Sequence, residues 1–375
     1  MNGIPAVREF SFDNYEQEED SRAVDITNVV DVDNQIADED DDSEDEIIKR
    51  TDNLLLVGPV QDDAAYMEVW VSNEEEESLY MHHDFLLPSL PLCTERLHHD
   101  PGSDKSGNMC MDPIITVWDL DIQESLEPAF KLNSKKKSEK AKRRIWSQRC
   151  GIRFILESSL RAYISKWLSR PLANTTDLDE GRPHTTITAF KEKVQSLGFS
   201  PDEAQHILTG CADGRVRLFH CRDPQSVNSS FVKWKTMNEV EKVLWNPNSN
   251  NYFVVGDNAG YLLFADKHHP KNFLWSQKAH EEEISGVCFN TNVGNLLAST
   301  SREGCLKIWK FDSSEISPVY SHEFEMGRLQ CVKQSPEDPF TLAFGGEKPP
   351  RCRMYNIKNF VAVRRAFDIS DAENI

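Results

Sequence analysis

Residues 194–219 read VQSLGFSPDEAQHILTGCADGRVRLF, and this stretch decides the fold. Its first half places an aromatic residue, Phe199, after apolar residues and before a serine and a proline. Its second half is a strand, a turn of small residues, and a closing strand that ends at Phe219. In the closing strand Val216 and Leu218 alternate with two arginines, so one face is apolar and the other is polar. This alternation predicts a half-buried β-strand.

The turn inside this stretch joins the two strands of a hairpin. It holds CAD at 211–213, flanked by Gly210 and Gly214. Glycine and aspartate are typical of tight turns between strands. Asp213 is therefore expected to form structural hydrogen bonds rather than to act in catalysis.

Both halves of the stretch recur further along the chain. The first half returns as KVLWNP around Trp245, as GVCFNT around Phe289 and, in a degraded form, as CVKQSP around Gln334, at intervals of 46, 44 and 45 residues. The closing aromatic returns at intervals of 45, 45 and 46 residues, at Phe264, Trp309 and Tyr355. Two series with one shared period of ~40–45 residues and four strands per unit are the signature of a WD-type β-propeller.

The upstream chain extends the closing-strand series. Trp70 follows the strand-like run LLLVG, and Trp118 with Asp119 forms the WD dipeptide itself. The interval from Trp118 to Phe219 is two periods, so one closing strand is missing and should end near residue 175. Counting it predicts an all-β WD40-type propeller of seven blades across 51–368, followed by a tail at 369–375. His280 precedes a first strand, where such repeats often carry Gly-His, and a structural hydrogen-bonding role is expected for it.

Neither the motifs nor the composition indicate an enzyme. The sequence has no P-loop, GxGxxG, GxSxG or HExxH motif. The histidine pairs at 82–83, 98–99 and 268–269 are poor chelators, because adjacent residues on a strand point to opposite faces. No apolar run approaches the ~20 residues of a membrane helix. We therefore expect no catalytic residue, cofactor, metal, small-molecule substrate or membrane contact. The nine cysteines, without a CxxC pair, are expected to be reduced thiols of a nuclear or cytosolic protein.

The net charge of −20 is distributed unevenly. The run 31–46 holds ten acids and no base, so 1–50 is expected to be an acidic disordered region. A short strand at 7–12 that completes a blade is the one exception considered. The part of the acidic run at 38–46 either holds basic partners, such as histone tails or ribosomal proteins, or serves as a disordered solubilising tail. Ser43 lies in DDSEDE, a context suited to an acid-directed kinase, whose phosphate would add to the negative charge.

A basic loop at 132–144 interrupts the propeller. Its bases include six residues that suit a nuclear localisation signal or contacts with RNA phosphates, namely Lys135, Lys136, Lys137, Lys142, Arg143 and Arg144. The alternative is a solvated loop between blades.

Several of these strings together resemble the periodic tryptophan protein 1 family. They are SLYMHHDFLLPSLPL, ITVWDLDIQESLEPAFKL, KAHEEEISGVCFN and LAFGGEKPPRCRMYNI, and the resemblance spans roughly residues 45–368. The family consists of WD-repeat proteins of the nucleus and nucleolus. The resemblance implies a scaffold for ribosome biogenesis, in ribosomal RNA transcription and pre-ribosome maturation, with chromatin association. It implies protein partners, namely pre-ribosomal factors, ribosomal proteins or histones, and indirect association with rRNA or rDNA.

Two other functions stay open. Arg222 stands where WD receptors of cullin-type ubiquitin ligases carry an arginine that touches the adaptor, although Phe219 and His220 replace the usual tryptophan and aspartate. The chain would then be a substrate receptor. A histone-binding propeller without a ribosomal role is the other alternative.

The segment 145–177 departs from the repeat. It lacks a small-residue turn and an alternating strand, although its length suits most of a blade. With one compatible choice of codons, reading one base later turns 145–156 into YGHSDAVFDSSW, which resembles the start of a WD repeat. We therefore interpret 145–177 as a blade read out of frame. The apolar spacing of Phe154, Ile155, Leu160, Ile164 and Leu168 looks more helical than extended. An irregular or helical insert is therefore expected in place of the third blade, with a gapped or strained ring.

Overall fold

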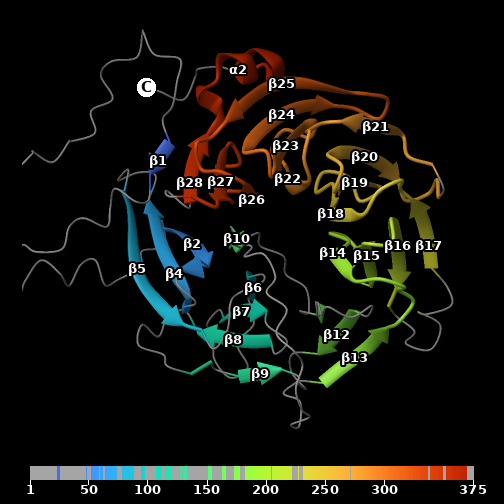
Figure 1. Cartoon of the computed structure of the whole chain (residues 1–375), viewed down its shortest axis with the longest axis horizontal. Coiled ribbons are helices and arrows are strands. Elements are labelled where there is room, and N and C mark those ends of the chain that lie inside the picture. The colour runs from blue at the N-terminus through green and yellow to red at the C-terminus, as the bar shows by residue number, and fades with distance from the viewer. Residues whose placement is uncertain are drawn as a thin grey trace, which may run out of the picture.

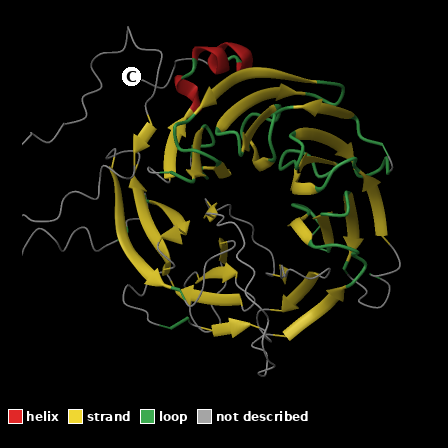
Figure 2. Cartoon of the chain, in the orientation of Figure 1, coloured by secondary structure: helices red, strands yellow, loops and turns green. Residues whose placement is uncertain are grey.

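The computed structural model of the chain describes residues 23–25, 48, 52–58, 60–61, 64–73, 78–87, 94–97, 107–111, 115–119, 127–128, 130–132, 151–153, 163–165, 173–177, 182–203, 205–221, 227, 231–270, 272–336, 338–348 and 352–369. Its strands form seven antiparallel sheets that follow one another around a ring (Figure 1). Strands dominate the described structure, and the helix lies at the rim of the ring (Figure 2). The predicted all-β WD-type propeller is confirmed.

Three consecutive blades show the repeat in its regular form, with each strand paired to the next. The fourth blade holds β14 (Val194–Phe199), β15 (His206–Cys211), β16 (Arg215–His220) and β17 (Phe231–Lys235). The fifth holds β18 (Val240–Trp245), β19 (Tyr252–Asp257), β20 (Tyr261–Asp266) and β21 (Trp275–Lys278). The sixth holds β22 (Ile284–Phe289), β23 (Leu296–Ser301), β24 (Cys305–Phe311) and β25 (Ile316–Glu323). The innermost strands β14, β18 and β22 each begin with a register shift at their second residue.

The polar residue of the first motif shapes the turn after each innermost strand. Asn246 Oδ1 accepts a hydrogen bond from the amide of Asn248 at 2.9 Å, and Asn290 Oδ1 accepts one from Asn292 at 2.9 Å. In the same place Ser200 Oγ accepts from the amide of Glu203 at 3.4 Å. Side chains that bond to the backbone a few residues on favour such turns, which explains why serine or asparagine follows the aromatic residue of the motif.

Segments from both ends of the chain build the seventh blade. It holds β26 (Leu329–Gln334), β27 (Thr341–Gly346) and β28 (Cys352–Asn356), and its outer strand is β1 (Ala23–Asp25), in register with Val24 opposite Met354. The N-terminal region therefore supplies a strand to the C-terminal blade, which closes the ring. This strand departs from the prediction of a region 1–50 without regular structure. Before residue 52 the structure describes only β1 and Ile48. The candidate strand at 7–12 therefore lies outside the described residues.

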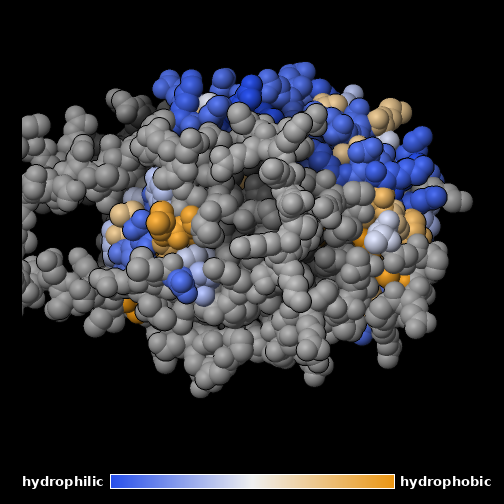
Figure 3. All heavy atoms as spheres, turned by 60° about the horizontal axis from the view of Figure 1, so that its bottom comes forward, coloured by the Kyte–Doolittle hydropathy of each residue, from blue (hydrophilic) through white to orange (hydrophobic). Residues whose placement is uncertain are grey.

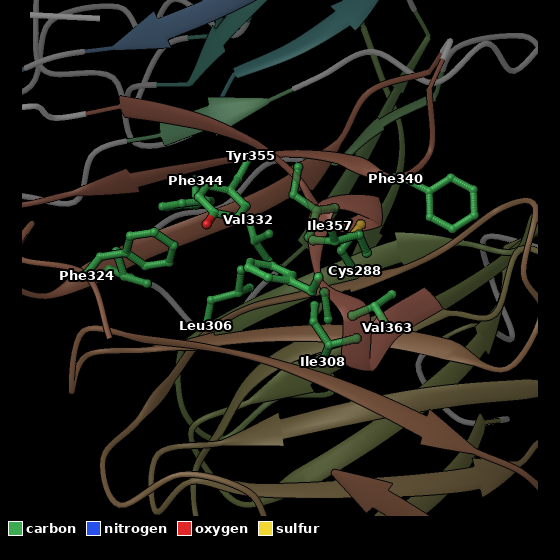
Figure 4. Packing of buried hydrophobic residues seen from close by; sticks show 14 of the residues in the cluster. Cys288, Leu306, Ile308, Phe324, Val332, Phe340, Phe344, Tyr355, Ile357 and Val363 are labelled. Atoms are coloured by element: carbon green, nitrogen blue, oxygen red, sulfur yellow. The ribbon is translucent and has the colours of Figure 1, made fainter. Parts of the chain in front are cut away.

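The chain leaves β28 through the short 3-10 helix η2 (Ile357–Asn359) and the helix α2 (Val361–Phe367). Val363 of α2 is completely buried in the core between the sixth and seventh blades, where Leu306, Phe344 and Tyr355 pack (Figure 4). The ring of Phe360 stacks on Tyr320 of β25 with centroids 3.7 Å apart. The helix therefore covers the outer end of this junction between blades.

The first two blades each have at least four strands. The first holds β2 (Asn53–Gly58), β4 (Ala64–Asn73), β5 (Ser78–Leu86) and the short β3 (Val60–Gln61), and its inner strand is β10 (Gly151–Arg153), from about a hundred residues downstream. The second holds β6 (Thr94–Leu97), β7 (Gly107–Met111), β8 (Ile115–Asp119) and β9 (Phe130–Leu132).

The third blade is the irregular one. It consists of β11 (Tyr163–Ser165), β12 (Ala173–Asp177) and β13 (Arg182–Ile187). β12 lies where the missing closing strand was predicted, near residue 175. Within the described part of 145–177 there are three short strands, and β10 pairs in the first blade rather than here. The helical expectation is wrong at Ile164, which lies in β11. A segment without alternation cannot bury one face and hydrate the other, and as described this blade is one strand short.

Candidate functional site: a buried tetrad beneath a loop face

A chain of four side chains runs through the sixth blade. Trp309 Nε1 donates to Ser299 Oγ at 2.9 Å, Ser299 Oγ lies 2.7 Å from His280 Nε2, and His280 Nδ1 lies 2.6 Å from Glu303 Oε1. Trp309 is in β24, Ser299 in β23, Glu303 in the turn between them, and His280 in the loop before β22. The tetrad therefore ties a loop, a turn and two strands together.

The protonation states follow from the geometry. Burial lowers the pKa of His280 to about 4, against the opposing attraction of Glu303. Burial alone would raise the pKa of Glu303, but the hydrogen bond from His280 and one from the Glu281 amide hold it below its ordinary value. A neutral imidazole that donates from Nδ1 to an ionised carboxylate and accepts at Nε2 satisfies every contact. His280 and Ser299 are at most 1% exposed and their polar atoms bond to one another, so the tetrad ties the blade together rather than facing solvent.

The fourth blade has different residue types at the positions that correspond to the tetrad. Phe190 stands where His280 stands, four residues before the innermost strand. Asp213 is hydrogen-bonded to Arg217 Nη1 at 3.2 Å and to Arg215 Nη1 at 3.1 Å, and the Arg217 guanidinium lies 5.4 Å from the centroid of Phe190. Arg217 is only 3% exposed. An ion pair over an aromatic ring therefore replaces the tetrad in this blade.

The fifth blade uses a buried aspartate to shape its turn. Asp257 Oδ1 accepts from the amides of Ala259 at 3.0 Å and Tyr261 at 2.7 Å, and Oδ2 accepts from Asn238 Nδ2 at 2.8 Å. The tetrad positions of this blade hold Val254 and Asn258 in place of serine and acid. Among the fourth, fifth and sixth blades, the complete tetrad is thus confined to the sixth.

The repeat aromatics lie in the packed layers between strands. Trp245, Phe264, Phe289, Trp309 and Tyr355 are each at most 5% exposed, as are Trp70, Trp118 and Phe219. Phe199 is half-buried against the fourth-blade core. Trp245 Nε1 donates to the carbonyl of Gly198 at 3.2 Å and so joins the fifth blade to the fourth. Asp119 ends β8 opposite Gly107.

Known proteins show the same repeat. A family model described as WD domain, G-beta repeat, matches residues 181–220 and 271–310. The Periodic tryptophan protein 1 homolog of Drosophila melanogaster is 58% identical over 375 residues, an alignment that covers 97% of this chain and 81% of the relative. The chain belongs to the periodic tryptophan protein 1 family. Periodic tryptophan protein 1 of Saccharomyces cerevisiae is 25% identical over 385 residues, covering 87% of this chain and 66% of the relative.

In this member of the periodic tryptophan protein 1 family, several predicted residues cannot be placed. Ser43, Lys135, Lys136, Lys137, Lys142, Arg143, Arg144 and Arg222 lie outside the described residues. His268 and His269 lie in an exposed turn, and their Nδ1 atoms are each 3.0 Å from a different oxygen of Asp266.

Three buried thiols of this family member are held in the protonated form. Burial raises the pKa of Cys221 to about 11 and also raises the pKa of Cys211 and Cys288. The thiolate is the reactive form of cysteine, so these residues act as small apolar side chains. Among the described residues, no group of three or more potential ligands is arranged to hold a metal ion, and no helix is long and apolar enough to cross a membrane. Hydrophilic side chains dominate the described surface in Figure 3, and apolar ones form small groups at its left and right.

Sequence reasoning identified His280 and Trp309 of the tetrad but missed Ser299 and Glu303. A positional signal was present. Glu303 lies six residues before its closing aromatic, as Asp213 does before Phe219. Aligning the two turns on the closing aromatic would have singled out Glu303 as the acid of the sixth blade.

Proposed function

We propose that this WD-repeat protein is a non-catalytic scaffold of the nucleolus that acts in ribosome biogenesis, in ribosomal RNA transcription and pre-ribosome maturation, with chromatin association. Membership of the periodic tryptophan protein 1 family carries the proposal. The tetrad supports a structural role for its residues, because His280 and Ser299 are buried and bond to their neighbours within the blade. WD repeats generally serve protein–protein contacts, so pre-ribosomal factors, ribosomal proteins or histones are the proposed partners.

Affinity purification of the tagged full chain from nuclear extract tests this function. Co-purification of large-subunit precursor factors and ribosomal proteins, retained after nuclease treatment, is the expected result. Recovery of a cullin adaptor would indicate a substrate receptor of a ubiquitin ligase instead. Recovery of histones alone would indicate a histone-binding propeller without a ribosomal role.

The nuclear location is proposed from the basic run at 135–144, and imaging tests it. The full chain fused to a fluorescent protein should concentrate in nucleoli. Replacing Lys135, Lys136 and Lys137 together with Lys142, Arg143 and Arg144 by alanine should redistribute it to the cytoplasm. Nucleolar signal that survives this change would place the targeting information elsewhere in the chain.

A further inference from the structure

Met237 is fully exposed, at 101% of its reference area, in the loop between β17 and β18. A single exposed apolar side chain is ordinary on a protein surface, but this one stands on a fixed loop. Thr236 Oγ1 donates to the carbonyl of Asn238 at 2.6 Å, and Asn238 Nδ2 donates to Asp257 Oδ2 at 2.8 Å. The amide of Thr236 donates to the carbonyl of Gly214 at 2.9 Å. The loop therefore holds the thioether side chain in water at a defined place.

Hydrogen bonds join this loop to two other connections of the fifth blade. The amide of Asn258 donates to the carbonyl of Glu239 at 3.0 Å, which links the loop to the turn between β19 and β20. Lys278 Nζ, at the end of β21, donates to the carbonyl of Ala259 at 2.8 Å, and the amide of Ala279 donates to the carbonyl of Gly260 at 2.9 Å, which links that turn to the segment after β21. Because consecutive strands of this blade are antiparallel, the three connections lie at the same end of it, and together they form one continuous surface.

We call this surface the Met237 face. Its exposed side chains are Met237, Glu239, Asn258, Tyr261, Glu281 and Glu282. Tyr261 is 37% exposed. Methionine and tyrosine are among the residue types over-represented in protein interfaces, where each offers a large apolar contact area.

The charge of the Met237 face is negative. Glu239, Glu281 and Glu282 are exposed, and the Glu281 side chain is 86% exposed. Lys278 Nζ donates to the carbonyl of Ala259, lies 3.7 Å from a carboxylate oxygen of Glu281 and lies 5.5 Å from the centroid of the Tyr261 ring. Lys235, at the end of β17, is an exposed base beside the loop. Glu239, Glu281 and Glu282 thus border an apolar centre, and Lys278 offsets part of the charge of Glu281.

We propose that the Met237 face docks a basic polypeptide segment that carries one apolar side chain. The apolar residue would cover Met237 and Tyr261, and flanking lysines or arginines would pair with Glu239 and Glu282 and share Glu281 with Lys278. Carboxylates repel phosphates, so nucleic acid is a poor occupant of this face. The inference rests on the proposed scaffold function, to which it adds the docking surface and the chemistry of the partner.

A peptide selection on the full-length protein tests the proposal. The probe is a displayed library of short random peptides, selected on the immobilised chain at physiological salt and again at high salt. The expected outcome is enrichment of peptides with several lysines or arginines around one leucine, methionine or phenylalanine. The Met237→Ser variant should bind the enriched peptides roughly tenfold more weakly, and the Glu281→Lys, Glu282→Lys double variant should abolish the preference for basic residues. High salt should weaken binding to the wild-type chain.

Leu274→Ser is the matched control. Leu274 is an exposed apolar residue of the same blade, 38% exposed, in the connection between β20 and β21. This variant should leave peptide binding unchanged. The proposal would be overturned by enrichment of acidic peptides, by no enrichment at all, or by binding that neither test variant changes. It would also be overturned if an RNA oligonucleotide bound the Met237 face and displaced the bound peptides. Nuclear purification tests the ribosomal role separately, so either experiment can fail without the other.

Discussion

His280 Nδ1 and Glu303 Oε1 lie 2.6 Å apart, and the His280 side chain is completely buried. The pair spans 23 residues of sequence and joins the loop before β22 to the turn after β23. Burial lowers the pKa of the imidazole to about 4, so folding at neutral pH requires no charged histidine here. The loop before β22 also carries Glu281 and Glu282 of the Met237 face, so the tetrad supports a surface as well as a core.

The buried histidine predicts a loss of stability at mildly acidic pH. The unfolded chain binds a proton at His280 below its ordinary pKa of 6.5, whereas the folded chain resists until about 4. More protons are therefore bound by the unfolded state in this window, and stability falls as pH decreases from 6.5 to 4, by roughly 3 kcal/mol in all for this group. Urea unfolding at several pH values, on wild type and His280→Gln, measures it. The stability gap between the two proteins should shrink toward pH 4, and a gap that does not change with pH would contradict the assignment.

At Trp245, two substitutions should separate the stability lost with its packing from the stability lost with its hydrogen bond between blades. Its ring packs against Phe253, with centroids 5.7 Å apart, and its Nε1 donates to Gly198. Trp245→Ala should lower the free energy of unfolding by ~3–5 kcal/mol. Trp245→Phe keeps much of the packing and should cost less, although the lost hydrogen bond contributes ~1 kcal/mol. Chemical denaturation checks both values, with Leu274→Ala at the exposed surface as the control expected to change little.

The parts of the fold that could be predicted from the sequence are those with strong local patterning. The aromatic series and the alternating strands predicted the regular blades, because each strand carries its own apolar face. The pairing of β1 with β28 was not predictable in the same way. Ala23–Asp25 has no pattern of its own, and its place depends on a vacant sheet edge that only the closed ring provides.

The site shows the same division. His280 and Trp309 stand at recognisable offsets in a repeat, whereas Ser299 looks like any small strand residue until the strands are paired. The docking role of Met237 could not be inferred from the sequence, because exposure is a property of the loop's conformation and not of its residue types. The reading-frame interpretation of 145–177 stays a prediction. Sequencing the transcript tests it, and an uninterrupted frame that encodes this segment, also present in close relatives, would end it.

The Asp213–Arg217 pair predicts strong coupling between a turn and a strand. Both side chains are nearly buried, with 6% and 4% exposure, so removing the acid leaves a cation without its partner. Asp213→Ala should cost ~3–5 kcal/mol of stability. The double variant Asp213→Ala, Arg217→Leu should recover much of this loss, because no buried charge then remains unpaired. Arg215→Ala is the control. Its side chain is 33% exposed, and the loss should be at most ~1 kcal/mol. Equal losses for Asp213→Ala and Arg215→Ala in a denaturation series would refute the coupling.

At Gly260, addition of a single methyl group by substitution with alanine should lower the stability of the fold markedly. Its φ of +82° lies in the left-handed region, and a Cβ there would be 2.0 Å from the backbone oxygen of His280. The Gly260 carbonyl also accepts hydrogen bonds from the amides of Ala279 and His280. Gly260→Ala should therefore cost more than the ~1–2 kcal/mol of a left-handed alanine alone, because the loop that carries the tetrad histidine must move. The matched change is Gly294→Ala, where the nearest atom to the new Cβ is 3.6 Å away and the contact is an ordinary one. It should alter stability by less than ~0.5 kcal/mol. Thermal unfolding of the two variants side by side gives the comparison. If the Gly260 substitution were as well tolerated as the Gly294 substitution, the close approach of this turn to His280 would be disproved.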